Sequence, residues 1–75
     1  MTKEVVYVRD PSATGHLLGK VLVCVPVGDT GSYPSTKPAG LWLGKFTFDV
    51  TDDQDANPNN YKVDDVSNPT ALVAV

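Results

Sequence analysis

The stretch "LWLGKFTFDV", residues 41–50, alternates apolar and polar side chains in a regular way. The even-numbered positions include Trp42, Phe46, Phe48 and Val50, and the odd-numbered positions include Lys45, Thr47 and Asp49. An alternation of period two is typical of a β-strand that has one face in the core and one face in water. We therefore expect a strand at 41–50 whose aromatic face is buried.

Four other segments also have strand composition. They are "KEVVYVR" at 3–9, "LLGKVLVCVPV" at 17–27, "YKVDDV" at 61–66 and "TALVAV" at 70–75. The segment at 17–27 is apolar on both parities, which suits a strand that is covered on both faces. Pro26 cannot donate a ladder hydrogen bond, so it marks an edge, a bulge or the end of that strand.

The segments between these strands are polar and rich in turn-forming residues. The two longest are residues 28–40 and 51–60, and nearly all of the nine acidic residues of the chain are aspartate, which favours turns over helices. The sequence therefore predicts one all-β domain over residues 1–75. We expect a small antiparallel β-sandwich or open barrel of about five strands with two long polar loops.

Part of the strand 41–50 repeats an earlier phrase. "PSATGHLLGKVLVCV" (11–25) and "PSTKPAGLWLGKFTFDV" (34–50) both carry Gly-x-x-Leu-Gly-Lys before an alternating run. A phosphate loop needs a longer spacing, a hydroxyl after the lysine and a following helix, so nucleotide binding is excluded. We interpret the phrases as pseudo-equivalent strands that match Val21 with Phe46, with chance similarity as the alternative.

In that interpretation two glycines, Gly19 and Gly44, lie on the inward faces of the two strands. There they leave room for a facing aromatic ring or mark a bulge. We expect Trp42 to be the ring that covers such a glycine. Trp42 and Tyr61 are both expected in the core.

Charge and cysteine content limit the partners and the compartment. The net charge is −3 and the lysines are scattered, which disfavours nucleic acid as a partner. We expect no membrane partner and no secretion through a signal peptide, because no apolar run is long enough. The single cysteine, Cys24, allows no intrachain disulfide and fits an intracellular (cytoplasmic) or virion location. Cys24 is expected to be a buried small apolar residue.

The acidic segment after residue 50 resembles the calcium loop of EF-hands over about a dozen positions. Its oxygen ligands in that resemblance would be Asp53, Asp55, Asn57 and Asp64. Pro58 stands where the EF-hand has glycine, and flanking helices are not predicted. The alternative is a solvated loop in which the aspartates cap turns. We therefore expect no bound metal, with these four residues as weak candidates.

No arrangement typical of an enzyme appears in the sequence. His16 is the only histidine, and no nucleophile lies in an evident pattern with it. Zinc is disfavoured because no cysteine and histidine cluster exists. We expect a non-enzymatic protein without a cofactor.

A small core without disulfides or zinc favours stabilisation by a protein partner or by homo-oligomerisation. The candidate interface residues lie on the even parity of 17–27, on the loop at 28–40 and in the C-terminal segment. They are Leu22, Cys24, Pro26, Tyr33, Leu72, Val73 and Val75. The C-terminal segment is expected to pair within its own sheet, with strand addition to a neighbouring subunit as the alternative.

The expected function is therefore structural: a module that assembles with itself or docks on a larger protein assembly. A small decoration protein of a virus particle, of the capsid cement type, is one such role. The alternative is a small acidic inhibitor that binds a basic patch of a partner enzyme, and its binding would weaken steeply with salt. A calcium-binding β-module is a weaker alternative.

Overall fold

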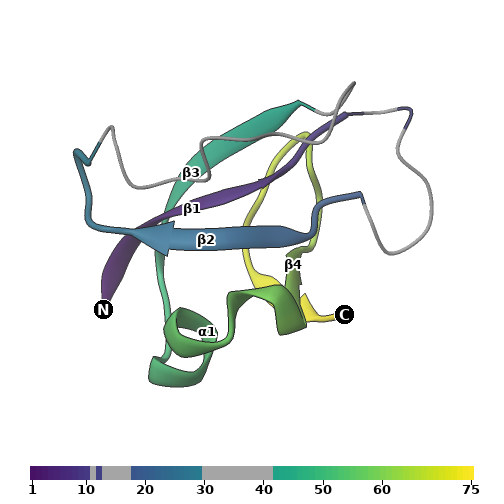
Figure 1. The fold of residues 1–75 in the computed structure, drawn as a ribbon. Helices are drawn as coiled ribbons and strands as arrows, with labels where there is room; N and C mark the ends of the chain where they lie inside the picture. Colours follow the sequence, from purple (N-terminus) through teal and green to yellow (C-terminus); the bar gives the residue numbers. More distant parts are fainter. Residues whose placement is uncertain (11, 13–17, 30–41) are drawn as a thin grey trace.

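Five antiparallel strands form two sheets in the computed structural model, which describes residues 1–10, 12, 18–29 and 42–75 (Figure 1). The strands are β1 (Thr2–Val8), β2 (Val21–Val25), β3 (Leu43–Asp49), β4 (Tyr61–Val63) and β5 (Leu72–Ala74). A short helix α1 (Asp52–Ala56) and a 3-10 turn η2 (Pro58–Asn60) connect β3 to β4. The predicted small five-stranded β-fold is confirmed, and the sheets do not close into a barrel.

The larger sheet has the order β2-β1-β3, so β1 lies in the middle. The register places Val5 opposite Cys24 on β2 and opposite Phe46 on β3. On the β2 side the register shifts between Val6 and Tyr7, which is the irregularity of a β-bulge. Val8, the last residue of β1, donates its N–H to the carbonyl of Lys20 at 3.0 Å.

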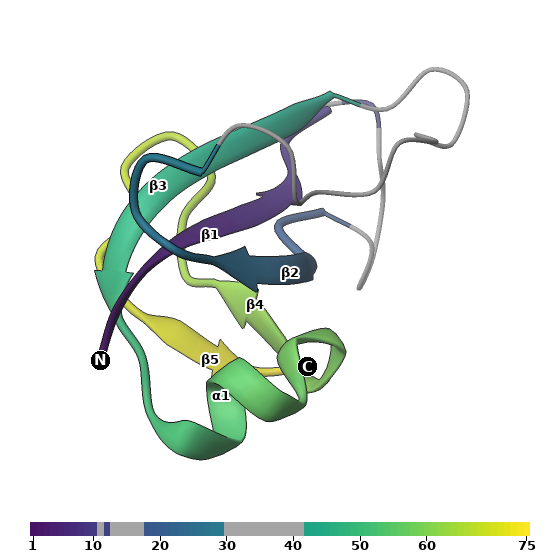
Figure 2. The same ribbon diagram turned by 60° about the vertical axis from the view of Figure 1, so that its left-hand side comes forward.

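Both faces of the larger sheet are buried along β1, since Val5, Val6, Tyr7 and Val8 are all buried, and the second sheet packs on one of these faces. Figure 2 shows β4, β5 and α1 on the same side of the three-stranded sheet. The buried side chains of Val5, Val21 and Val50 form the core cluster. Cys24, Phe48, Tyr61 and Leu72 pack against this cluster. Because Tyr61 and Leu72 belong to the second sheet, the arrangement is a small two-layer sandwich.

The two sheets are also joined at one side. The N–H of Val63 donates to the carbonyl of Gly19 at 2.9 Å, and Lys20 and Lys62 form an isolated antiparallel bridge. Gly19 has φ of +81°, a conformation that favours glycine, and a Cβ at this position would lie 3.0 Å from the side chain of Val63 and 3.3 Å from that of Val66. This contact ties the start of β2 to β4.

Gly44 leaves room for an aromatic ring, as predicted, but the ring belongs to Tyr7. The two residues are direct partners in the β1–β3 register, and a Cβ at Gly44 would lie 2.7 Å from Cζ of Tyr7. Tyr7 is buried, whereas Trp42 is 62% exposed. The expectation that Trp42 covers the glycine and lies in the core was therefore wrong. Tyr7 covers Gly44 because the two residues are opposite each other in the pairing of β1 with β3, and the sequence alone does not reveal this pairing.

The two copies of the doubled phrase are not pseudo-equivalent strands. β2 and β3 flank β1 on opposite sides within one sheet, and both are antiparallel to it. Opposite Val5 stand Cys24 and Phe46, so the structure does not match Val21 with Phe46. Their environments differ as well, because Val21 is fully buried and Phe46 is 41% exposed. This hypothesis was wrong.

The segment at 51–60 is not a plain loop, because α1 and η2 lie within it. Thr51 forms a capping box with Gln54: the N–H of Gln54 donates to Oγ1 of Thr51 at 3.1 Å, and the N–H of Thr51 donates to Oε1 of Gln54 at 2.9 Å. The signature Thr-x-x-Gln was present in the sequence. The expectation of a loop gave weight to the aspartates and overlooked this cap. None of the helices in the described ranges could cross a bilayer.

Candidate interaction surface

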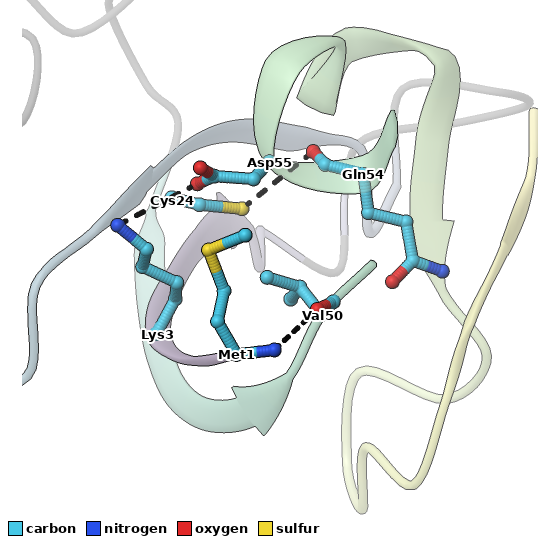
Figure 3. Close-up of polar contacts among 6 residues, drawn as sticks. All are labelled: Met1, Lys3, Cys24, Val50, Gln54 and Asp55. Atoms are coloured by element: carbon cyan, nitrogen blue, oxygen red, sulfur yellow. Dashed lines mark hydrogen bonds and ion pairs between the residues drawn. The ribbon is translucent and has the colours of Figure 1, made fainter. Parts of the chain in front are cut away.

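The three candidate residues of β2 and its end have different surroundings. Cys24 packs against the core and lies beneath α1, where its thiol donates to the carbonyl oxygen of Gln54 at 3.9 Å (Figure 3). Leu22 is half-buried, and Pro26, which follows the last residue of β2, is exposed. The helix α1 of the same chain therefore contacts β2 at Cys24.

Burial raises the pKa of the Cys24 thiol, and the nearby carboxylate of Asp55 raises it further. Lys3 acts in the opposite direction, and its ammonium forms an ion pair with Asp55 at 3.8 Å (Figure 3). A thiol with a raised pKa is a weak nucleophile at neutral pH. Its environment is therefore that of a packing residue.

The C-terminal candidates lie on and beside β5. The register pairs Leu72 with Val63 and Val73 with Lys62, which confirms that this segment pairs within its own sheet. Leu72 points to the core, whereas Val73 is 39% exposed and Val75 is 54% exposed. The N–H of Val75 donates to the carbonyl of Asn60 at 3.0 Å, so the backbone remains attached to η2.

Two residues singled out in the sequence, Tyr33 and His16, lie outside the described residues. Most of the predicted loop at 28–40 lies outside them as well. The other candidate residues lie on the strands or directly beside them.

The β3 aromatic surface, formed by Trp42, Phe46 and Phe48, is the apolar feature that stands out among the described residues. Trp42 is 62% exposed and Phe46 is 41% exposed. The rings of Phe46 and Phe48 are in contact, with centroids 5.1 Å apart and an interplanar angle of 54°. Phe48 packs against the core, so one end of this surface is buried and the end at Trp42 and Phe46 is exposed.

Sequence reasoning placed this face in the core because alternation shows which residues share a face but not how far the second sheet extends. The second sheet reaches Phe48 and Val50 but leaves Phe46 partly uncovered. A signal for an edge strand was available in the charges of Lys45 and Asp49, since edge strands often carry charged side chains.

The four weak metal candidates do not gather at one point. Asp53 accepts hydrogen bonds from Nδ2 of Asn57 at 3.0 Å and from the hydroxyl of Tyr61. The bond to Asp53 raises the pKa of the Tyr61 phenol. Asp55 forms its ion pair with Lys3 instead. Within the described part of the chain, no group of three or more His, Cys, Asp or Glu side chains could hold a metal ion.

Asp64, the fourth candidate, lies in the loop between β4 and β5. Its carboxylate accepts hydrogen bonds from the Thr70 hydroxyl and from the N–H groups of Asp65, Thr70 and Ala71. The bonds from Thr70 contribute most to lowering its pKa from 3.8 to about 2. The Asp64 carboxylate therefore holds the loop between β4 and β5 together.

An open hollow of about 320 Å³ lies beside this loop. It is lined by Leu18, Lys62, Val63, Asp64, Asp65 and Val66. The Asp64 carboxylate already accepts hydrogen bonds within its own loop, and Lys62 of β4 is paired with Val73 of β5. Among the described residues that line it, none is a nucleophile with a neighbouring base.

Comparison of the chain with protein-family models, with curated proteins and with solved structures found no match.

Proposed function

We propose that this protein is a non-enzymatic interaction module, which assembles with itself or docks on a larger protein assembly through the β3 aromatic surface. The observation that carries the proposal is the exposure of Phe46 on β3 and of Trp42, which directly precedes this strand. Aromatic side chains are enriched in protein interfaces, and Trp is frequent among the residues that contribute most binding energy. Phe46 also contacts the ring of Phe48, so its exposed part is not an isolated apolar group.

The framework beneath this surface supports the same function. Phe48 is fixed against the core, and the ring of Phe46 leans on it at 5.1 Å. A partner would therefore meet rings that are already ordered, which reduces the conformational entropy lost on binding. The finer role of a virion decoration protein of the capsid cement type belongs to this proposal, because such a protein has to seat on a larger assembly.

A second candidate is the small acidic inhibitor of a partner enzyme. The observation in its favour is the acidic first turn of α1, in which Asp52 and Asp53 are exposed and the last turn has no basic residue. A partner held by these carboxylates would dissociate as ionic strength rises, whereas a partner held by aromatic rings would not.

Site-specific cross-linking tests the main proposal. A photo-cross-linking phenylalanine analogue is placed at position 42 in cells that express the protein, and the control chain carries it at the exposed position 59. We expect discrete cross-linked species at position 42 and not at position 59, and they should persist at high salt. Equal yields at the two positions, or no product at either, would contradict a role for the β3 aromatic surface.

A further inference from the structure

Arg9 lies directly beside the β3 aromatic surface. The N–H of Arg9 donates to the carbonyl of Trp42 at 2.8 Å, which continues the β1–β3 register one step beyond the last pair of the two strands. Residues directly opposite each other on antiparallel strands direct their side chains to the same face of the sheet. The guanidinium of Arg9 and the indole of Trp42 therefore leave the sheet on one face and next to each other.

This face is the one on which the second sheet packs, but the second sheet covers only part of it. Along β1, Val5 and Arg9 are four residues apart and share a face, and Val5 belongs to the core. Val5 lies opposite Phe46, which is still 41% exposed. Figure 2 shows the start of β3 away from β4 and β5. Arg9 and Trp42 therefore form the uncovered end of this face.

Both side chains at this end are available to a partner. Trp42 is 62% exposed, and Arg9 is exposed as well. Within the described ranges no carboxylate forms an ion pair with Arg9, whereas the ammonium of Lys3 is paired with Asp55. Arg9 is also the only arginine of the chain. A guanidinium presents several N–H donors in a planar fork that matches the two oxygens of a carboxylate.

We propose that the β3 aromatic surface binds a segment of a partner protein that carries a carboxylate next to apolar side chains. Arg9 binds the carboxylate, and Trp42 and Phe46 pack against the apolar side chains. This inference rests on the proposed function and names the chemistry of the partner. Because Trp42 and Phe46 are four residues apart in an extended chain, a partner segment of about four extended residues, roughly 13 Å, reaches both rings.

Charge favours a single carboxylate over a polyanion. The chain has a net charge of −3, so it repels nucleic acids and anionic lipid surfaces, which present many negative charges. A lone carboxylate needs only the one guanidinium, which binds both of its oxygens. The surrounding aromatic rings keep water from this pair, and salt screens such a pair less than a fully exposed one. The complex should therefore persist at high salt.

Charge variants at position 9 test the carboxylate in the cross-linking experiment at position 42. Arg9→Glu places a like charge against the partner's carboxylate, and Arg9→Gln removes the charge but keeps a hydrogen-bond donor. We expect Arg9→Glu to lower the yield of the cross-linked product about tenfold, and Arg9→Gln to lower it less. Lys62→Glu is the matched control, because it makes the same change in net charge on the second sheet. It should leave the yield unchanged, and circular dichroism checks the fold of each variant.

A compensating exchange in the partner identifies the carboxylate. Mass spectrometry of the product from position 42 locates the partner segment, and each Asp or Glu in that segment is then replaced by arginine in turn. One of these replacements should restore the yield with Arg9→Glu, because the ion pair forms again with its charges exchanged. The inference is overturned if Arg9→Glu cross-links as wild type does, if Lys62→Glu lowers the yield equally, or if every replacement leaves the yield low.

The two proposals fail separately. A discrete product at position 42 that does not respond to the charge at position 9 overturns the carboxylate, and the interaction function stands with a partner of different chemistry. If position 42 gives no specific product, the interaction function falls, and the proposed partner chemistry falls with it.

Discussion

The carboxylate of Asp64 holds the chain between β4 and β5 in place. One oxygen, Oδ1, accepts from the N–H groups of Asp65, Thr70 and Ala71 at 2.9, 2.8 and 3.2 Å. The other oxygen accepts from the Thr70 hydroxyl. Three amides and a hydroxyl directed at one charged group favour its ionised form, which is why its pKa falls to about 2.

This pKa makes a prediction about stability and pH. Because the pKa is lowered from 3.8 in the folded state, the ionised carboxylate stabilises the fold above about pH 4, and this contribution is lost as pH falls toward 2. We expect Asp64→Ala to lower the melting temperature at pH 7. The difference from wild type should shrink as the pH is lowered from 4 to about 2.

Thermal unfolding followed by circular dichroism at several pH values measures this difference. Asp52→Ala is the control, since Asp52 is exposed at the start of α1. It should show a small effect without the same pH profile. A melting difference for Asp64→Ala that is equal at pH 7 and pH 2 would contradict the role of the ionised carboxylate.

Among the helices and strands, α1 is the element whose formation depends most on residues close to it in the sequence. It is five residues long, too short to be stable from propensity, and its residues are not buried. The capping box of Thr51 and Gln54 fixes its start, and Asp55 attaches it to β1 through the ion pair with Lys3. The helix in turn shields Cys24, whose thiol donates to the carbonyl of Gln54.

Loss of the cap should therefore destabilise the helix and expose the thiol together. We expect Thr51→Ala to lower the free energy of unfolding by about 1 kcal/mol, the usual value for a lost N-cap. We also expect faster reaction of Cys24 with a thiol reagent under native conditions, because the helix opens more often.

Urea denaturation measures the first effect and the labelling rate measures the second. Thr51→Ser keeps the hydroxyl and should behave almost as wild type does. If the serine and alanine variants label Cys24 at the same rate, the helix does not protect the thiol through this cap.

At the scale of the whole molecule, the two sheets are held together by a small core. Val5, Val21 and Val50 come from the larger sheet and its end, and Tyr61 and Leu72 reach them from the smaller one. Leu72 and Val73 are neighbours on β5 but point to opposite sides, one to the core and one to solvent. Of these two β5 residues, only Leu72 therefore contributes its side chain to packing between the sheets.

Because Leu72 packs on the core and Val73 does not, substituting each by alanine should lower the free energy of unfolding by different amounts. Leu72→Ala removes packing against the core and should lower the free energy of unfolding by about 2 kcal/mol. Val73→Ala removes an exposed side chain and should change it by less than about 0.5 kcal/mol. Urea denaturation of the two variants measures both values. Equal losses would mean that β5 does not dock the second sheet through Leu72.

The sequence predicted the strands well because their signal is local. Alternation and turn residues located five strands, although the structure ends them sooner: β2 stops at Val25 and β4 at Val63. The cap of α1 was also local, in Thr51 and Gln54, and was overlooked. For the interaction surface the sequence predicted the C-terminal pairing, but it wrongly placed Trp42 in the core.

The sequence alone determined an all-β chain of alternating strands, since period two and turn chemistry act between near neighbours. Only the tertiary structure decided that Tyr7 covers Gly44, that α1 contacts Cys24 and that β3 lies at the edge with Trp42 and Phe46 exposed. These outcomes depend on which strand pairs with which, and in what register. That choice is made by contacts between residues far apart in the chain, which no local pattern records.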